Sequence, residues 1–140
     1  MSDVKKQRRQ FGTIFLVELW ERFAYYAFNG LFVLFAISLH FDEKQAFMVF
    51  GIFSALAFGL PTIGGIISDQ ILGIKRALTV GAIILCCGYT LLGFAYSIDT
   101  IFLALGLIAT GNALFKPNPS ALISLIYHND SEKTDSAFTL

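Results

Sequence analysis

Charged residues are scarce in this chain. Only 14% of its 140 residues are Asp, Glu, Lys or Arg, whereas 56% are hydrophobic and the mean hydropathy is +0.69. A soluble domain of this size carries roughly a quarter of its residues as charges. The composition therefore excludes an ordinary soluble domain and predicts an all-α integral membrane protein in contact with the lipid bilayer.

The chain is also poor in the groups that enzymes and metal sites require. Its two cysteines, Cys86 and Cys87, are neighbours in an apolar run, and on a helix they point about 100° apart, so we interpret them as packing residues. No His, Cys and carboxylate group has the spacing of metal ligands, and no nucleophile stands beside an orienting base. The formal net charge of zero argues against nucleic acid. We expect no enzyme, no metal, no cofactor and no nucleic-acid partner.

The apolar residues fall into four runs, each long enough to cross a bilayer as a helix. The predicted spans are residues 11–39, 45–68, 77–97 and 101–127, and they follow a basic tail at residues 1–10. The tail and the first run do not form a signal peptide, because the run is too long and contains charges. Residues 128–140 are polar at first and then lead into the apolar start of a fifth helix.

Lys and Arg residues gather at alternate ends of the four spans. The tail carries four of them and the second connection carries Lys75 and Arg76, whereas the other two connections carry only Lys44. Cytoplasmic segments of membrane proteins are enriched in Lys and Arg. The pattern predicts a multi-pass protein of the cell (plasma or inner) membrane whose N-terminus and residues 128–140 are cytoplasmic.

The first span contains charges where an apolar helix is expected. Each one costs about 2.5 to 3.5 kcal/mol near the middle of a span, which the apolar residues barely offset unless the charges pair. At about 100° per residue, one stripe of the helix contains Glu18, Glu21, Arg22, Tyr25, Tyr26 and Asn29. This stripe predicts a wet, ion-paired cavity. The alternative is a structural pair between Glu18 and Arg22, which leaves Glu21 without a partner.

Lys116 is a second charge inside a predicted span, and two prolines follow it. Pro117 and Pro119 remove backbone donors, so carbonyls about a turn earlier need water, side chains or another helix. A helix broken at membrane depth borders a cavity, where Lys116 would pair with Glu18 or Glu21. The alternative is that its stem reaches the interface. Two acids and two bases around one cavity suggest movable ion pairs rather than bond-breaking chemistry.

The second connection begins with glycines and carries one acid and two bases. We interpret residues 69–76 as a polar loop after the pair Gly64 and Gly65. The loop is either a tight turn with cytoplasmic basic residues or a gating contact. The residues that would carry a gating contact are Gly65, Asp69, Gly73 and Arg76.

Three stretches together resemble the proton-dependent oligopeptide transporter family of the major facilitator superfamily. They are Glu18-x-x-Glu21-Arg22-Phe23-x-Tyr25-Tyr26, Gly64-Gly65-x-x-x-Asp69-x-x-x-Gly73 and Phe115-Lys116-Pro117-Asn118. Residues 51–59, 81–83 and 135–140 resemble the bacterial di- and tripeptide permease branch. The resemblance covers nearly the whole chain.

This resemblance implies four transmembrane helices from the N-terminal half of a major facilitator fold, and import of di- and tripeptides with protons by alternating access. The residues implied in proton coupling are Glu18, Glu21, Arg22 and Lys116. Those implied in peptide binding are Tyr25, Tyr26, Asn29, Lys116 and Asn118. Many members carry arginine at the position of Asn29 and tyrosine at the position of Phe58, so one cation and one hydroxyl are missing here.

Members of that family have twelve or more helices in two halves. We therefore expect this chain to be an N-terminal fragment whose partner is the missing set of C-terminal helices of the same transporter, and to be inactive alone. Two other classes remain open from the residues: a small four-helix oligomeric channel or exporter, and a structural membrane subunit.

Overall fold

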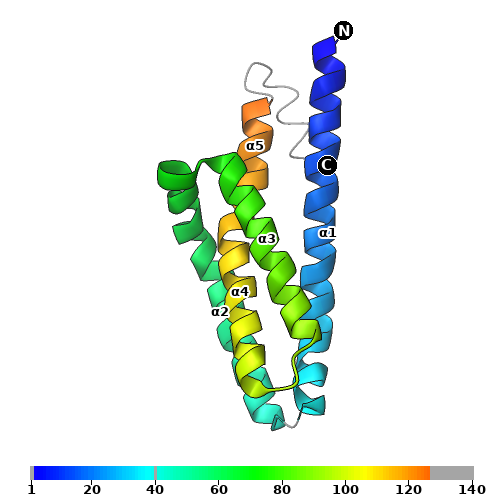
Figure 1. Cartoon of the computed structure of the whole chain (residues 1–140), viewed down its shortest axis with the longest axis vertical. Coiled ribbons are helices and arrows are strands. Elements are labelled where there is room, and N and C mark those ends of the chain that lie inside the picture. Colours follow the sequence, from blue (N-terminus) through cyan, green and yellow to red (C-terminus); the bar gives the residue numbers. More distant parts are fainter. Residues whose placement is uncertain (1, 40, 127–140) are drawn as a thin grey trace.

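The computed structural model describes residues 2–39 and 41–126, and Figure 1 shows that they form a bundle of long helices. The elements are α1 (Ser2–Ser38), α2 (Glu43–Ile67), the π-helix η1 (Ser68–Leu72), α3 (Ile74–Gly93), α4 (Ile98–Phe115) and α5 (Asn118–Ile126). The α1–α2 and α3–α4 connections lie at one end of the bundle, and η1 and α5 lie at the other (Figure 1). The long helices α1, α2, α3 and α4 therefore alternate in direction along the chain, as short connections predict.

Polar residues at the connections start the next helix. The backbone N–H of Asp42 donates to Oε1 of Gln45 at 3.3 Å, so the first turn of α2 is closed by a side chain. Before α4, Oγ of Ser97 accepts a hydrogen bond from the N–H of Thr100 at 3.3 Å. These contacts satisfy donors that a helix start leaves unpaired.

Aromatic side chains join α1 to α2 and α3. The ring of Phe28 on α1 lies 4.8 Å from the ring of Phe53 on α2 and 6.4 Å from the ring of Tyr89 on α3, centroid to centroid. Phe32 lies a turn further along α1, where it is buried and stacks on Phe50. This cluster holds α1 against the rest of the bundle.

Glycines let α4 approach α2 and α3 closely. A Cβ atom on Gly64 of α2 would overlap the backbone carbonyl of Ala113 on α4. On α3, a Cβ atom on Gly81 would lie 2.9 Å from the backbone nitrogen of Phe115, and one on Gly88 would lie 2.7 Å from Cγ1 of Ile108. Small residues at helix contacts are typical of membrane proteins, where close packing replaces the hydrophobic effect between helices.

The helices differ from the predicted segments in three places. First, α1 begins at Ser2, so most of the predicted basic tail belongs to the same helix as the first span. Second, α2 continues directly into η1, which ends at Leu72, so only Gly73 separates η1 from α3. The prediction of a loop at residues 69–76 is therefore wrong. Third, the predicted fourth span is two helices, α4 and α5. The limits of the membrane spans stay predictions, and residues 127–140 lie outside the described residues.

The turn at Gly73 is possible because glycine adopts backbone angles that other residues avoid. Its φ is 77° and its ψ is 145°, and its N–H donates to the carbonyl of Ser68 at 2.8 Å, which closes the last turn of η1. A sequence pattern of glycine and polar residues resembles a loop, but here a single residue makes the turn.

Within the described residues, three stretches are long and apolar enough to cross a membrane. They are Glu43–Leu72, Ile74–Gly93 and Ile98–Ser124. α1 is longer, but the charges of its middle and the basic residues near its start reduce its apolar character. Composition alone therefore does not assign α1 to the membrane, although it packs in the same bundle.

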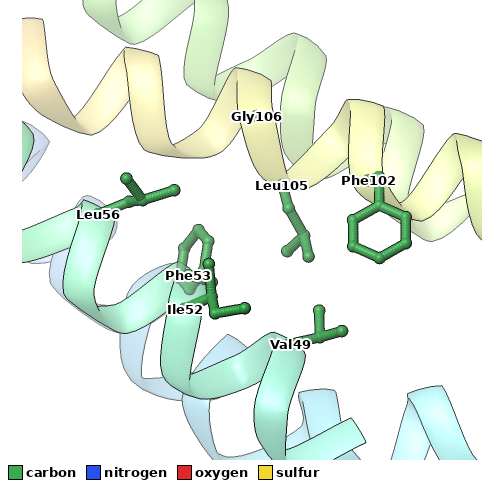
Figure 2. Close-up of a pocket in the computed structure, with 7 residues that line it drawn as sticks. All are labelled: Val49, Ile52, Phe53, Leu56, Phe102, Leu105 and Gly106. Carbon is green, nitrogen blue, oxygen red and sulfur yellow. The ribbon is translucent and has the colours of Figure 1, made fainter. Parts of the chain in front are cut away.

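Two shallow grooves on the bundle are lined almost entirely by apolar residues. Figure 2 shows one of about 150 Å³, where Val49, Ile52, Phe53 and Leu56 of α2 face Phe102, Leu105 and Gly106 of α4. The other, of about 390 Å³, lies between α1 and α3. Neither contains Glu18, Glu21, Arg22 or Lys116, so the charged residues lie elsewhere.

Candidate functional site

Glu21 and Arg22 form the centre of the charged site on α1. Nη2 of Arg22 lies 2.6 Å from Oε2 of Glu21, and the Glu21 side chain is only 5% exposed. Arg22 therefore pairs with Glu21 and not with Glu18, so the alternative of a structural pair between Glu18 and Arg22 is not formed. Neighbouring residues diverge by about 100° on a helix, but long side chains bend toward each other when burial leaves the carboxylate no water.

The break between α4 and α5 places Lys116 beside this pair. The N–H of Lys116 still donates to the carbonyl of Asn112 at 2.9 Å, but Pro117 has no N–H to continue the ladder. Nζ of Lys116 lies 4.7 Å from the ring centroid of Tyr25. It is also close enough to Glu21 and Arg22 to interact electrostatically with both.

Several buried polar atoms around this region have no hydrogen-bond partner among the described residues. They are Oε1 of Glu21, Nε of Arg22, Oδ1 of Asn29, the hydroxyl of Tyr89, and both Oδ1 and Nδ2 of Asn112. Burying such a group unpaired costs about 1 to 3 kcal/mol, so they are expected to meet water, a ligand or other helices. The site is polar and incompletely paired, as the predicted wet cavity requires.

The structure divides the predicted stripe of α1. Tyr25 is buried beside Lys116, whereas Tyr26 is 67% exposed on the outside of the described bundle. Glu18 and Asn29 are half-buried, and within the described residues no ion pair joins Glu18 to a base. Thus Glu21, Arg22, Tyr25 and Lys116 come together, and Tyr26 does not.

Asn118, predicted in the peptide site, is held in a buried contact between elements. Its Nδ2 donates to Oγ of Ser68 at 2.8 Å and also to the carbonyl of Leu114, and the residue is 1% exposed. Ser68 in turn donates to the carbonyl of Gly64 at 2.8 Å. The amide thus fastens the start of α5 to the junction of α2 and η1, which favours a structural role over contact with a substrate.

The predicted gating residues lie in different elements rather than in one loop. Gly65 is on α2, where a Cβ atom would make ordinary contact with Pro117, and Arg76 is exposed on α3. Asp69 is exposed on η1. No ion pair joins Asp69 to Arg76 in the part of the chain that the structure describes. Their role in gating stays a prediction.

Sequence reasoning missed three residues of the site. Phe58 was noted only for a missing hydroxyl, but its ring centroid lies 4.5 Å from Nζ of Lys116. Tyr89 was not singled out, yet its buried hydroxyl interacts electrostatically with Glu21. Asn112 is fully buried one turn before Lys116. The sequence did offer a signal for two of them, because Tyr89 and Asn112 are polar residues within otherwise apolar spans.

The described residues of the site are charged, aromatic and amide side chains. No group of three or more metal-binding side chains occurs among the described residues. The carboxylate of Glu21 interacts with the cations of Arg22 and Lys116, which both lie near the ring of Tyr25, so a change in its charge alters the balance that holds both cations. Such an arrangement can switch between two ion-pairing states.

Comparison with known proteins gives this arrangement a context. Residues 75–140 match the model of the POT family. Nearly the whole chain also aligns with bacterial proteins named dipeptide and tripeptide permease B. The protein of Salmonella typhimurium is 49% identical over 137 residues, which cover 96% of this chain and 28% of the relative. The Aeromonas hydrophila protein is 47% identical, with 96% and 27% covered.

Solved structures show the same helical arrangement. Tetrameric PepTSo2 is 43% identical with a TM-score of 0.87, over 96% of this chain and 29% of that one. A peptide transporter POT in complex with alafosfalin is 29% identical with a TM-score of 0.88, over 94% and 28%. This chain thus spans under a third of the length of the proteins it matches.

Proposed function

This chain belongs to the POT family, and we propose that it forms the N-terminal part of a proton-coupled symporter that imports di- and tripeptides by alternating access. It is an all-α membrane protein with the helical arrangement of the N-terminal half of a major facilitator fold. In the proposal α1 is the first membrane span, in addition to the three apolar stretches that follow it. Relatives are named permeases for dipeptides and tripeptides, which supports the substrate class.

The observation that carries the proposal is the buried pair of Glu21 and Arg22 beside Lys116. A proton taken up by Glu21 would neutralise the partner of Arg22 and leave two neighbouring cations without it. Two packings of the bundle would then differ by the energy of one ion pair, which is the kind of bias that alternating access needs. In this role Glu21 carries the proton, and Arg22 and Lys116 respond to it, with Glu18 nearby.

The proposed peptide site lies beside these charges. Tyr25 and Lys116 face each other there, and Asn29 has an unpaired buried oxygen. The rest of the site would come from helices that this chain does not contain, so Tyr26, exposed on the outside, would face them. The proposal therefore expects that the chain does not transport alone and that it acts in transport rather than as an enzyme.

The test compares the chain alone with a chimera in which it replaces the matching segment of the Salmonella permease. Both are reconstituted in liposomes, and dipeptide uptake is followed with and without an inward proton gradient. We expect gradient-dependent uptake by the chimera, and none above empty liposomes by the chain alone. A chimera that inserts and elutes as a folded protein but shows no such uptake overturns the proposal. Flux through the chain alone would instead favour a channel.

A further inference from the structure

The ammonium group of Lys116 lies between two aromatic rings from different helices. Its Nζ is 4.7 Å from the ring centroid of Tyr25 on α1 and 4.5 Å from that of Phe58 on α2. Glu21 pairs with Arg22, and no carboxylate of the described residues lies within ion-pair distance of Lys116. The two ring faces therefore lie against the ammonium, and the charges of Glu21 and Arg22 act on it without an ion pair.

A ring face attracts a cation within about 6 Å, and the attraction grows where water is excluded. The two rings are not equivalent. Tyr25 is shared, because Cζ of Arg22 also lies 5.9 Å from its centroid. The contact of Phe58 is with Lys116.

We propose that Phe58 is a positioning residue which, with Tyr25, forms an aromatic clamp that holds the Lys116 ammonium while it has no carboxylate partner. The clamp stabilises the cation without neutralising it, so Lys116 keeps a full charge for a carboxylate that arrives from outside the described residues. Only the consequence for transport rests on the proposed function. The clamp itself is a property of this chain.

The clamp is tested first without transport. Reductive methylation with ¹³C-formaldehyde turns each lysine of the full chain into a dimethylamine that stays cationic, and a Lys116→Arg variant assigns the Lys116 signal. Ring currents should shift this signal away from those of the exposed Lys44 and Lys75. We expect the shift to persist in Phe58→Tyr and to shrink in Phe58→Leu and Phe58→Met. The clamp is overturned if the Lys116 signal coincides with those of exposed lysines, or if its chemical shift is the same in Phe58→Leu as in the parent.

The transport consequence is measured in the chimera. We expect Phe58→Met to raise KM for a dipeptide about fivefold, the factor that one lost cation–π contact of about 1 kcal/mol gives, with kcat changed less. Phe58→Tyr should leave KM close to that of the parent because it keeps the ring. Equal KM for Phe58→Met and the parent overturns the positioning role.

Phe47→Leu is the matched control. Phe47 is another exposed phenylalanine of α2, three turns before Phe58, and it does not contact Lys116. It should leave both the Lys116 signal and KM unchanged. If Phe47→Leu moves the signal as much as Phe58→Leu does, the effect is general loosening of α2 and the proposal fails. A chimera without dipeptide uptake would overturn the proposed function. The methyl signals of the chain would still show whether the rings of Tyr25 and Phe58 hold Lys116.

Discussion

At the level of single residues, Glu21 is the most constrained charge of the described chain. Its side chain is 5% exposed, one oxygen pairs with Arg22 and the other has no hydrogen-bond partner among the described residues. Removing one member of a buried pair leaves an uncompensated charge, which is strongly unfavourable. Glu18 lies three residues earlier but is only half-buried and has no such pair.

We predict that Glu21→Gln lowers proton-driven dipeptide uptake by the chimera at least about tenfold. Glutamine cannot take up the proton, and a change of about 1.4 kcal/mol in an ion-pairing equilibrium is a factor of ten. Uptake is measured in liposomes with an inward proton gradient. Glu43→Gln, which removes an exposed carboxylate at the start of α2, serves as the control and should retain uptake. Equal uptake by the two variants would contradict the role of Glu21.

At the level of elements, the positions of the charges depend on how closely the helices approach. α4 packs against both α2 and α3 where glycines remove side chains, and the same stretch of α4 ends at Lys116. Asn118 and Ser68 then fasten α5 to the junction of α2 and η1. The location of the Lys116 ammonium thus follows from backbone contacts several residues away.

Gly64→Ala is predicted to destabilise the protein by about 1 to 3 kcal/mol. The added methyl group would overlap the carbonyl of Ala113, and because both atoms belong to helix backbones, α2 and α4 must move apart. The control is Gly59→Ala on the same helix, where nothing lies within 4 Å of the new atom and a gain of about 0.5 to 1 kcal/mol is expected. Thermal unfolding in detergent compares them, and equal midpoints would refute the close approach.

At the level of the whole molecule, the described bundle exposes many large apolar side chains. Trp20, Phe23 and Leu34 are each about two-thirds exposed on α1 alone. A monomeric soluble protein rarely shows such a surface, whereas lipid or further helices can cover it. The matched proteins are more than three times as long as this chain, so both kinds of cover are expected in the proposed transporter.

The ends of the bundle also differ in charge, which predicts its orientation. Arg9 is near the start of α1, and Lys75 and Arg76 are at the start of α3. Both helix starts lie at the end of the bundle that contains η1 (Figure 1), and the positive-inside rule predicts that this end is cytoplasmic. In a background with Cys86 and Cys87 replaced by alanine, an impermeant maleimide should label Tyr96→Cys in intact cells. It should label Gln70→Cys only after lysis. The reverse pattern would refute the orientation.

Much of this arrangement could be predicted from residues alone. The apolar runs predicted the long helices, the prolines after Lys116 predicted a break in the fourth of them, and the charges of α1 predicted a polar face. The turn at Gly73 was missed because one glycine with positive φ replaces what the pattern presents as a loop. The separation of Tyr25 from Tyr26 was missed because a helical wheel gives angles about one axis and not the direction of the neighbours.

The sequence by itself determined that this chain is a membrane protein of helices with paired charges inside, because apolar length and the cost of burying charge depend only on residue type and spacing. Only the tertiary structure decided which groups meet: Arg22 with Glu21 rather than Glu18, Lys116 with the rings of Tyr25 and Phe58, and Asn118 with Ser68. These contacts join different helices or depend on side-chain burial, and both are set by how the glycine-lined helices pack.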